Sequence, residues 1–382
     1  MRAVFALSDL QRDGALLTVA LGVTALATPV AMRVALRVGL VDRPAPHKFH
    51  REPTPYLGGL AIALSVLASL AFAMVAEPRV RSELMAVAFG ATALAAIGLV
   101  DDWATISPFP RLAVQAVAAV ALWHAGIRVT PSGVQALDLP ATILVVMAVT
   151  NAVNLLDNMD GLSTGTVAIA SLFLFVAAYW QGQTLVAVMA IVLAGACLGF
   201  LPFNFNPARI FLGDAGTLFL GFLLATIVIK LDLSGYPLMT RAVVPMLFVG
   251  MPLFDVTLVV FSRWRAGRPV FQGGTDHSSH RLVALGASPR LAALASYAAA
   301  AVAGAGGLWL IRVHSLALTW AVAAAGVVVA VLLLAFMETV DATGRRASFV
   351  PSSVLVSALS ALEVPPMLEP VPTPIRSQAG PA

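Results

Sequence analysis

The side chains best suited to chemistry in this sequence are carboxylates and amides that interrupt long apolar runs. Asp101 and Asp102 are neighbours in LVDDW, and adjacent carboxylates repel each other unless a cation or a shared proton lies nearby. The pair could hold a Mg²⁺ ion, or one member could act as a base. A solvated pair at a helix end is the alternative. Arg111 follows, and it could neutralise the pair or hold a phosphate.

A second polar cluster lies in the stretch NAVNLLDNMDGL. Asn151, Asn154 and Asn158 recur at spacings that place them on one face of a helix. Asp157 lies beside that face, and Asp160 falls at the turn that follows. Oxygen ligands of this kind suit a hard divalent cation. Hydrogen bonding between helices is the alternative, and it is favoured for Asn151 taken alone.

A third cluster is FNFNPARIFLGDAG, where Asp214 stands between Gly213 and Ala215 at the start of an apolar run. Small neighbours allow a ligand to approach the backbone closely, and the first amides of a helix favour anions. Asp214 is therefore expected either to cap the helix or to bind a metal. Phe211 could be a stacking platform for a base, or it could be a packing residue.

The fourth cluster, GGTDHSSHRL, combines His277, His280 and Arg281 in a glycine-rich loop. The spacing of the two histidines would also fit zinc, but no cysteine or HExxH pattern accompanies them. Two histidines and an arginine near several carboxylates are typical of a site that holds a diphosphate. The sequence thus pairs candidate metal ligands with candidate phosphate ligands.

The composition indicates which scaffold must position these residues. The chain is 59% hydrophobic and 11% charged, whereas soluble domains have about 25% charged residues. The sequence predicts an all-α polytopic membrane protein with about eleven transmembrane helices, at 15–38, 57–76, 83–100, 110–126, 139–156, 165–181, 184–201, 211–230, 240–262, 290–311 and 314–336. Residues 1–337 would form this transmembrane domain. Residues 338–382 are rich in Pro and Ser and would form a disordered cytoplasmic tail.

All four clusters lie in odd-numbered loops between the predicted spans, or on the span ends beside them. Odd-numbered loops share one side of the membrane, and they also carry more of the Arg and Lys residues than the even-numbered loops do. The positive-inside rule then places the active site at the cytoplasmic face of the cell (inner) membrane, with the N-terminus outside and the C-terminus inside. The basic residues gather at helix ends rather than in a stripe, so no nucleic acid is expected as a partner.

Six motifs, in this order along the chain, resemble those of a known family: HKFHREPTPYLGGL, DDW, NAVNLLDNMDGL, FNFNPARIFLGDAG, MPLFDV and DHSSHRL. The family is the polyprenyl-phosphate N-acetylhexosamine-1-phosphate transferases, glycosyltransferase family 4, and the resemblance covers residues 42–285. It implies that a UDP-N-acetylhexosamine gives its sugar-1-phosphate to a polyprenyl phosphate such as undecaprenyl phosphate and releases UMP. Mg²⁺ is the implied cofactor, with Mn²⁺ as its substitute.

The resemblance also implies roles for single residues. Asp214 and Asn154 look like the ligands of Mg²⁺. Asp101 and Asp102 match the catalytic acidic pair, of which one would orient the acceptor phosphate and the other would support the metal. Direct attack by the lipid phosphate is favoured, and an aspartyl intermediate is the competing mechanism.

The remaining roles concern the two substrates. Phe211 is similar to the residue that stacks on uracil, and Asp157 and Asp160 fall where the family binds the nucleoside and the sugar. The residues that fall where the family holds phosphates are Lys48, Arg111, His277, His280 and Arg281. Membrane lipids and a second copy of the chain, in a homodimer, are the further partners that the resemblance implies.

The last loop bears on the branch of the family. The MurNAc-pentapeptide branch of peptidoglycan synthesis carries three consecutive histidines followed by Phe and Glu, where this chain has DHSSHRL. This difference favours the GlcNAc-type branch, whose products start lipopolysaccharide O-antigen, teichoic acid or other cell-wall glycans. Ser279 stands where that branch commonly has histidine, so another UDP-N-acetylhexosamine stays open. The competing hypotheses for the function are a MurNAc-pentapeptide transferase, a lipid-linked sugar transporter and an inactive scaffold.

Overall fold

The computed structural model of the protein describes residues 2–42, 53–76, 78–104, 106–131, 133–270 and 274–340. These residues are mostly helical, with one antiparallel pair of short strands in which Val41 lies opposite Pro55. The elements are α1 (Arg2–Val38), β1 (Val41–Asp42), β2 (Thr54–Pro55), α2 (Gly58–Ala76), η1 (Pro78–Val80), α3 (Arg81–Ala104), α4 (Pro108–His124), α5 (Gln135–Leu156), α6 (Leu162–Trp180), α7 (Thr184–Asn204), α8 (Gly213–Lys230), α9 (Leu238–Phe248), α10 (Gly250–Arg265), α11 (Ser278–Ala284), α12 (Pro289–Val313) and α13 (Leu316–Glu338).

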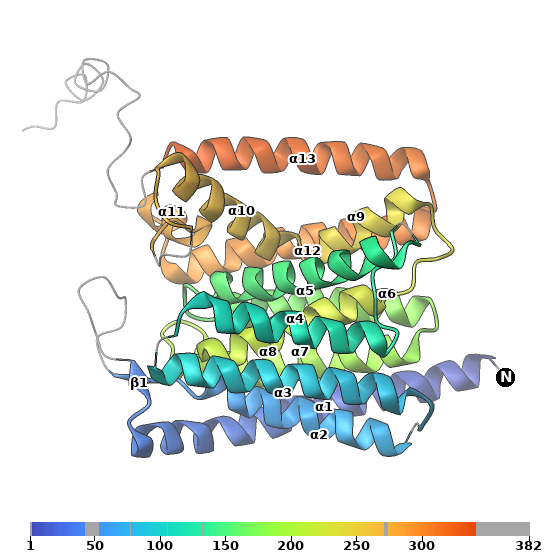
Figure 1. The fold of residues 1–382 in the computed structure, drawn as a ribbon, viewed down its shortest axis with the longest axis horizontal. Coiled ribbons are helices and arrows are strands. Elements are labelled where there is room, and N and C mark those ends of the chain that lie inside the picture. Colours follow the sequence, from blue (N-terminus) through green and yellow to red (C-terminus); the bar gives the residue numbers. More distant parts are fainter. Residues whose placement is uncertain are drawn as a thin grey trace, which may run out of the picture.

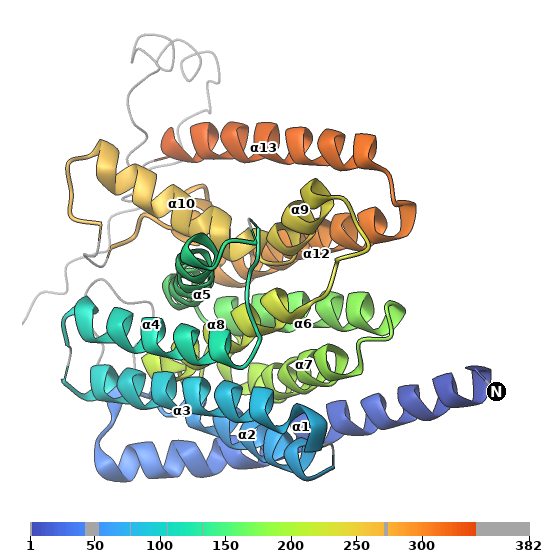
Figure 2. The same cartoon turned by 45° about the vertical axis from the view of Figure 1, so that its right-hand side comes forward.

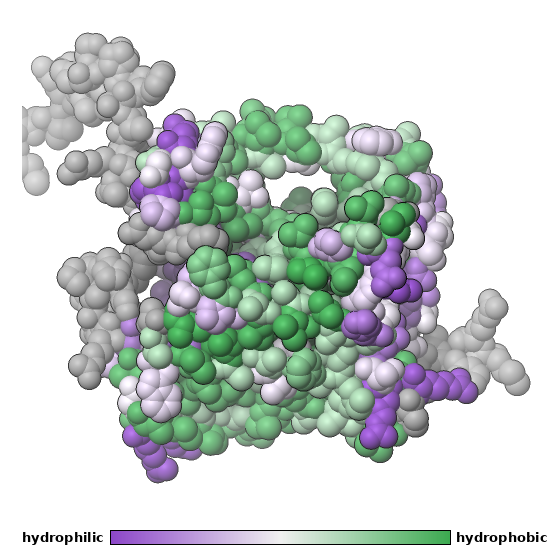
Figure 3. All heavy atoms as spheres, viewed as in Figure 1, coloured by the Kyte–Doolittle hydropathy of each residue, from purple (hydrophilic) through white to green (hydrophobic). Residues whose placement is uncertain are grey.

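On the face drawn in Figure 3, a mostly apolar band lies between two more polar ends. Among the described residues, nine helices are long and apolar enough to cross a membrane, and the bent pair α9–α10 makes a tenth. Helix α4, which occupies the remaining predicted span, has 17 residues and lies at the lower end of the range that crosses a bilayer. The protein is thus an all-α polytopic membrane protein, which confirms the predicted fold class.

The span predicted at 240–262 is present, but it consists of two helices rather than one. Helix α9 ends at Phe248, α10 begins at Gly250, and the two are bent by 79° (Figure 2). Pro252 explains the break, because its ring would clash with the carbonyl of Phe248 in a continuous helix and its nitrogen has no hydrogen to donate.

Helix α8 lies at the centre of the bundle and sets the position of the site. In the apolar stretch of α8 that could span a membrane, 83% is buried inside the protein, whereas the corresponding stretch of α13 is only 6% buried. Its neighbours approach closely through glycine: a Cβ on Gly59 would lie 2.2 Å from the Cα of Gly216, and a Cβ on Gly98 would lie 2.4 Å from the carbonyl oxygen of Asp214. The glycines of α2 and α3 therefore fix where α8 begins.

The described parts of the odd-numbered loops gather at one end of the bundle, where β1, α11 and the end of α13 also lie (Figure 1). The N-terminus lies at the opposite end. Lys48 and residues 341–382 are outside the described residues, so the role of Lys48 and the disordered tail stay predictions. Glu338, the first residue assigned to the tail, still belongs to α13.

Candidate active site

A cavity of about 640 Å³ opens among the ends of the helices, and all five odd-numbered loops contribute to it. Nine of the twelve site residues expected from the sequence line it, and Lys48, His277 and Arg281 do not appear in its described lining. The lining residues are Asp42, Tyr56, Asp101, Asp102, Ile106, Pro108, Arg111, Asn154, Asp157, Asn158, Met159, Asp160, Asn204, Asn206, Phe211, Gly213, Asp214, His280 and Pro289.

The two carboxylates of the acidic pair turn to different partners at the end of α3. Asp101 is buried and accepts the backbone N–H of Ile106 at 2.7 Å and the guanidinium of Arg111 at 2.5 Å. Asp102 accepts two backbone N–H groups in the first turn of α8, at 2.8 and 3.1 Å. It thus caps α8, whose first amides have no helical acceptor. Arg111 and the helix end relieve the repulsion between the neighbouring carboxylates.

Asp214 joins the groups that come from α4, α5 and α8. Its Oδ1 accepts a hydrogen bond from the amide of Asn154 at 2.6 Å, and its Oδ2 lies 3.4 Å from Nη1 of Arg111. The amide of Asn154 also donates to the hydroxyl of Thr217 at 2.7 Å. Arg111 therefore bridges Asp101 and Asp214. Four of the residues expected from the sequence form one contact network.

Backbone hydrogen bonds fasten the segment before α2 to the start of α8. Phe211 donates to the carbonyl of Pro55 at 2.8 Å and accepts from Gly58 at 3.1 Å, while Gly59 donates to Leu212 at 2.9 Å. The glycine that opens α8 has a φ of +73°, a value that favours glycine. These contacts hold the Phe211 ring and the Asp214 carboxylate at one wall of the cavity.

Asp160 lies in the turn between α5 and α6 and organises the loop before α8. Its Oδ2 accepts the side-chain amide of Asn206 and the backbone N–H of Ala208, both at 2.9 Å. The loop that carries Phe211 is therefore tied to the turn that carries Asp157 and Asp160. Both of these carboxylates and Phe211 line the cavity, and their roles toward a nucleoside and a sugar stay predictions.

Asp157 is the carboxylate that follows the last residue of α5. Burial, and after it the charges of Asp214, Asp160 and Asp102, raise the pKa of Asp157 to about 8. Carboxylates outnumber cations in the cavity: several aspartates line it, and Arg111 is the one arginine or lysine in its described lining. Asp157 is therefore largely protonated at neutral pH until a cation or a ligand arrives.

This raised pKa predicts how stability depends on pH. In an unfolded chain an aspartate ionises near pH 4, whereas Asp157 keeps its proton in the fold up to about pH 8. The folded protein binds more protons between these values, so the free energy of unfolding decreases as the pH rises through them. We expect substrate-free protein in EDTA to melt at a lower temperature at about pH 8.5 than at about pH 6. Asp157→Asn should reduce the difference, and an unchanged difference would contradict the assignment.

Sequence analysis did not single out Asp42 and Tyr56, although both line the cavity. The Tyr56 hydroxyl forms a hydrogen bond with Asp42, and its ring lies 6.2 Å from that of Phe211 at an angle of 53°. Burial, followed by the charge of Asp42, raises the pKa of Tyr56, so the phenol is protonated at neutral pH. The motif PTPYLGG contains this tyrosine, but a short loop has no periodicity that shows which way a side chain points.

The last loop forms α11, and only part of the expected phosphate site reaches the cavity. His280 lines it, and burial, followed by the charge of His277, lowers the pKa of His280 to about 4. At neutral pH the ring is uncharged and can bind a phosphate only through a ring N–H. His277 instead turns to Asp255 of α10, with 2.8 Å between Nδ1 and Oδ2. Arg281 is buried among other partners.

The residues at the centre of the site fit a Mg²⁺ ion. Within the described part of the chain, no three His, Cys, Asp or Glu side chains come together as a metal group. Mg²⁺ usually takes only one or two carboxylates and completes its shell with water and substrate phosphates. Asp214 and Asn154 are in contact, and an amide can turn its oxygen instead of its nitrogen toward an ion. These two residues would hold the metal.

The fold and the cavity together define a class: an integral membrane protein whose polar site lies at one end of its spans. Residues 84–232 match glycosyl transferase family 4. The chain is 33% identical over 280 residues to a probable undecaprenyl-phosphate N-acetylglucosaminyl 1-phosphate transferase of Bacillus subtilis, covering 71% of this chain and 77% of that protein. The chain therefore belongs to glycosyl transferase family 4, and the predicted family is confirmed.

Two further relatives bear on the branch. The decaprenyl-phosphate N-acetylglucosaminephosphotransferase of Mycobacterium tuberculosis is 31% identical over 309 residues, which cover 72% of this chain and 76% of that protein. A phospho-N-acetylmuramoyl-pentapeptide-transferase of Staphylococcus saprophyticus is 38% identical over 137 residues, which cover 35% of this chain and 40% of that protein. The two N-acetylglucosamine relatives thus match over more of the chain than this pentapeptide relative does.

Proposed function

We propose that the protein transfers N-acetylglucosamine-1-phosphate from UDP-N-acetylglucosamine to a polyprenyl phosphate and releases UMP. The observation that carries the proposal is the contact network of Asp101, Arg111, Asn154 and Asp214 in a cavity at the end of the spans. There a water-soluble nucleotide sugar and a lipid phosphate could meet. The names of the relatives from Bacillus subtilis and Mycobacterium tuberculosis supply the substrate classes.

In the proposed reaction an oxygen of the lipid phosphate forms a bond to the β-phosphorus of the donor. The bond from this phosphorus to the oxygen that bridges the two phosphates breaks, and UMP leaves with that oxygen. Such a transfer needs alignment and neutralised charge more than a strong nucleophile. In this reaction Arg111, whose Nη1 lies 3.4 Å from Oδ2 of Asp214, would bind and orient a phosphate. A bound Mg²⁺ would supply positive charge for the diphosphate and the leaving group.

The partners of the acidic pair support direct attack rather than an aspartyl intermediate. Both oxygens of Asp102 accept backbone N–H groups of α8, and both oxygens of Asp101 accept hydrogen bonds as well. To attack phosphorus, either carboxylate would have to give up hydrogen bonds that the fold already uses, which costs free energy. The geometry favours a role for the pair in holding Arg111 and the start of α8.

The first test is UMP release by purified protein in detergent. The assay would contain undecaprenyl phosphate, Mg²⁺ and either UDP-N-acetylglucosamine or UDP-MurNAc-pentapeptide. Mg²⁺-dependent UMP release with UDP-N-acetylglucosamine is the expected result. Release with the pentapeptide donor alone would move the protein to the other branch, and no release with a panel of UDP-N-acetylhexosamines would contradict the proposed activity.

We also propose that the cavity faces the cytoplasm. The distribution of Arg and Lys supports this orientation. Single cysteines in place of Ala208 and Ser234, at opposite ends of the bundle, would test it after the native Cys197 is replaced. In intact cells an impermeant thiol reagent should label the second and not the first. The reverse pattern would overturn the orientation.

Phe211→Ala should raise the KM for UDP-N-acetylglucosamine by about tenfold, because an aromatic side chain contributes roughly 1–3 kcal/mol when it stacks on a base. Phe211→Tyr keeps the ring and should stay close to the original KM. Initial rates at varied donor concentration would measure both values. If the alanine and tyrosine variants shift KM equally, the stacking role is wrong.

A further inference from the structure

Arg281 on α11 is a buried arginine whose guanidinium is hydrogen-bonded to other parts of the protein. The residue is 4% exposed. Its guanidinium donates five hydrogen bonds, to the carbonyl oxygens of Asp276, Met337 and Val340, the hydroxyl of Ser262 and the carboxylate of Glu338. A guanidinium has five N–H groups. Every donor is therefore in use, and none is left for a phosphate in this conformation.

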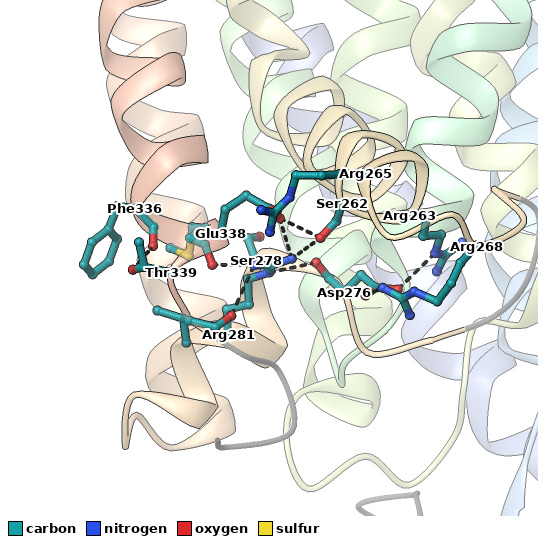
Figure 4. A network of polar contacts seen from close by, with 12 residues as sticks. Ser262, Arg263, Arg265, Arg268, Asp276, Ser278, Arg281, Phe336, Glu338 and Thr339 are labelled. Carbon is teal, nitrogen blue, oxygen red and sulfur yellow. Dashed lines mark hydrogen bonds and ion pairs between the residues drawn. The ribbon is translucent and has the colours of Figure 1, made fainter. Parts of the chain in front are cut away.

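The acceptors show what Arg281 connects (Figure 4). Two of them are carbonyls at the end of α13, where a cation is favoured by the helix dipole. The carboxylate of Glu338, on the last turn of α13, lies 2.9 Å from Arg281 and also accepts the hydroxyl of Ser262 at 2.6 Å. A buried arginine needs such a counter-charge. The network thus joins α10, α11 and the end of α13.

These polar contacts replace apolar packing for α13. Large side chains along its length are exposed, among them Trp320, Val328 and Leu332, and an opening is visible between α13 and the rest of the bundle (Figure 3). At its beginning the hydroxyl of Thr319 lies 3.0 Å from that of Thr240. Helix α13 is therefore fastened chiefly at its two ends, and Glu338 is the charged group at the end near the cavity.

Helix α11 carries residues of the cavity next to Arg281. His280 lines it, and the hydroxyl of Ser279 donates to Asn158, which is also part of the lining. The start of α11 is held by Asp255, which accepts the backbone N–H of Ser278 at 2.8 Å. Asp255 and the Arg281 network are therefore two separate supports for the seven residues of α11.

We propose that Glu338 is a positioning residue for the cavity: through Arg281 it fixes α11 and so the place of His280. The inference rests on the proposed function and on the expectation from the sequence that His280, which lines the cavity, contacts a substrate phosphate. A misplacement of about 1 Å by a change far from the chemistry is enough to slow an enzyme considerably. Glu338 has this effect without contact with the substrate. Helix α13, which carries Glu338, thereby helps to position a residue of the cavity.

The test is a double-mutant cycle with steady-state kinetics in both substrates. Glu338→Ala and His280→Ala should each lower kcat/KM by about tenfold, and they should change the same constant, either kcat or one KM. The double variant should resemble His280→Ala alone, because once the histidine side chain is absent its position no longer matters. Independent effects would multiply to about a hundredfold, and that result would overturn the proposal.

Glu83→Ala is the matched control. Glu83 is also an ion-paired glutamate, 2.7 Å from Lys230, but this pair joins the start of α3 to the far end of α8. Kinetic constants of this variant should equal those of the original protein. Glu338→Gln, which keeps an acceptor oxygen for Arg281, should retain more activity than Glu338→Ala.

Hydrogen exchange provides a readout that does not depend on activity. The amides of 278–284 should exchange faster in Glu338→Ala and should be unchanged in Glu83→Ala. A lower melting temperature with unchanged exchange in α11 and unchanged kinetic constants would make Glu338 merely structural and would overturn the proposal. Absence of turnover in the original protein would instead contradict the proposed function, and faster exchange of α11 would still show the link to Glu338.

Discussion

Replacing Asp214 by asparagine should lower kcat by about 10³-fold, which corresponds to ~4 kcal/mol of transition-state stabilisation. The carboxylate touches both Asn154 and Arg111, and in the proposed reaction its charge would hold a metal and orient the arginine. Asparagine has nearly the same shape, and the fold should persist because the cap from Asp102 contacts the backbone of α8 rather than this side chain. UMP release and the melting temperature, measured on the same preparation, would check both statements.

Asp232→Asn is the control for this variant. Asp232 lies just beyond the far end of α8 and accepts the backbone N–H of Ser234 at 2.8 Å. It is distant from the cavity, and its substitution should leave kcat within about twofold of the original value. If Asp214→Asn kept most of its activity while Asp232→Asn lost it, the cavity would not be the active site.

The substitution Gly98→Ala should reduce activity by at least about 10²-fold, although Gly98 offers no functional group. The added Cβ would lie 2.4 Å from the carbonyl oxygen of Asp214 and 2.5 Å from the nitrogen of Ala215. Backbone atoms cannot move aside as a flexible side chain can, so α3 and the start of α8 must separate. Overpacking of this kind costs roughly 1–3 kcal/mol of stability. Activity per folded molecule would be measured after size-exclusion chromatography.

Gly22→Ala in α1 tests whether any helical glycine would behave in the same way. No atom lies within 4 Å of the position that its Cβ would take, and alanine is the better helix former. This variant should be as active as the original protein and slightly more stable. Equal activity of the Gly98 and Gly22 variants would contradict the claim that the close contact between α3 and α8 positions the residues of the cavity.

Much of the fold follows from the sequence because spans and turns have strong local signals. Apolar length located the spans, and the parity of the loops indicated one shared site before any contact was known. The break in the span at 240–262 was missed because hydropathy is averaged over a whole span, and in this average Pro252 has little weight. Its effect is local, since its ring would clash with the carbonyl of Phe248 in a continuous helix.

The side-chain partners were harder to predict, and Arg281 shows why. An arginine after two histidines in a loop indicates a phosphate site, yet Arg281 is bonded to the end of α13, dozens of residues further on. The acidic pair was a similar case. Its residues were found from their types, whereas the division of partners between Arg111 and the amides of α8 depends on packing that no local pattern contains. Tyr56 was overlooked for the same reason.

The hydrogen bonds between Pro55–Gly59 and Phe211–Leu212 also bear on biosynthesis. The two segments are separated by roughly 150 residues, so at the usual 5–20 residues per second the second segment is made on the order of ten seconds after the first. During this delay α1 and α2 remain in the translocation machinery or the lipid, and the glycines at the start of α2 are not yet covered by α8. The cavity can therefore form only after more than half of the chain has been made, and a chain that is stopped before α8 would lack Asp214 and the cavity.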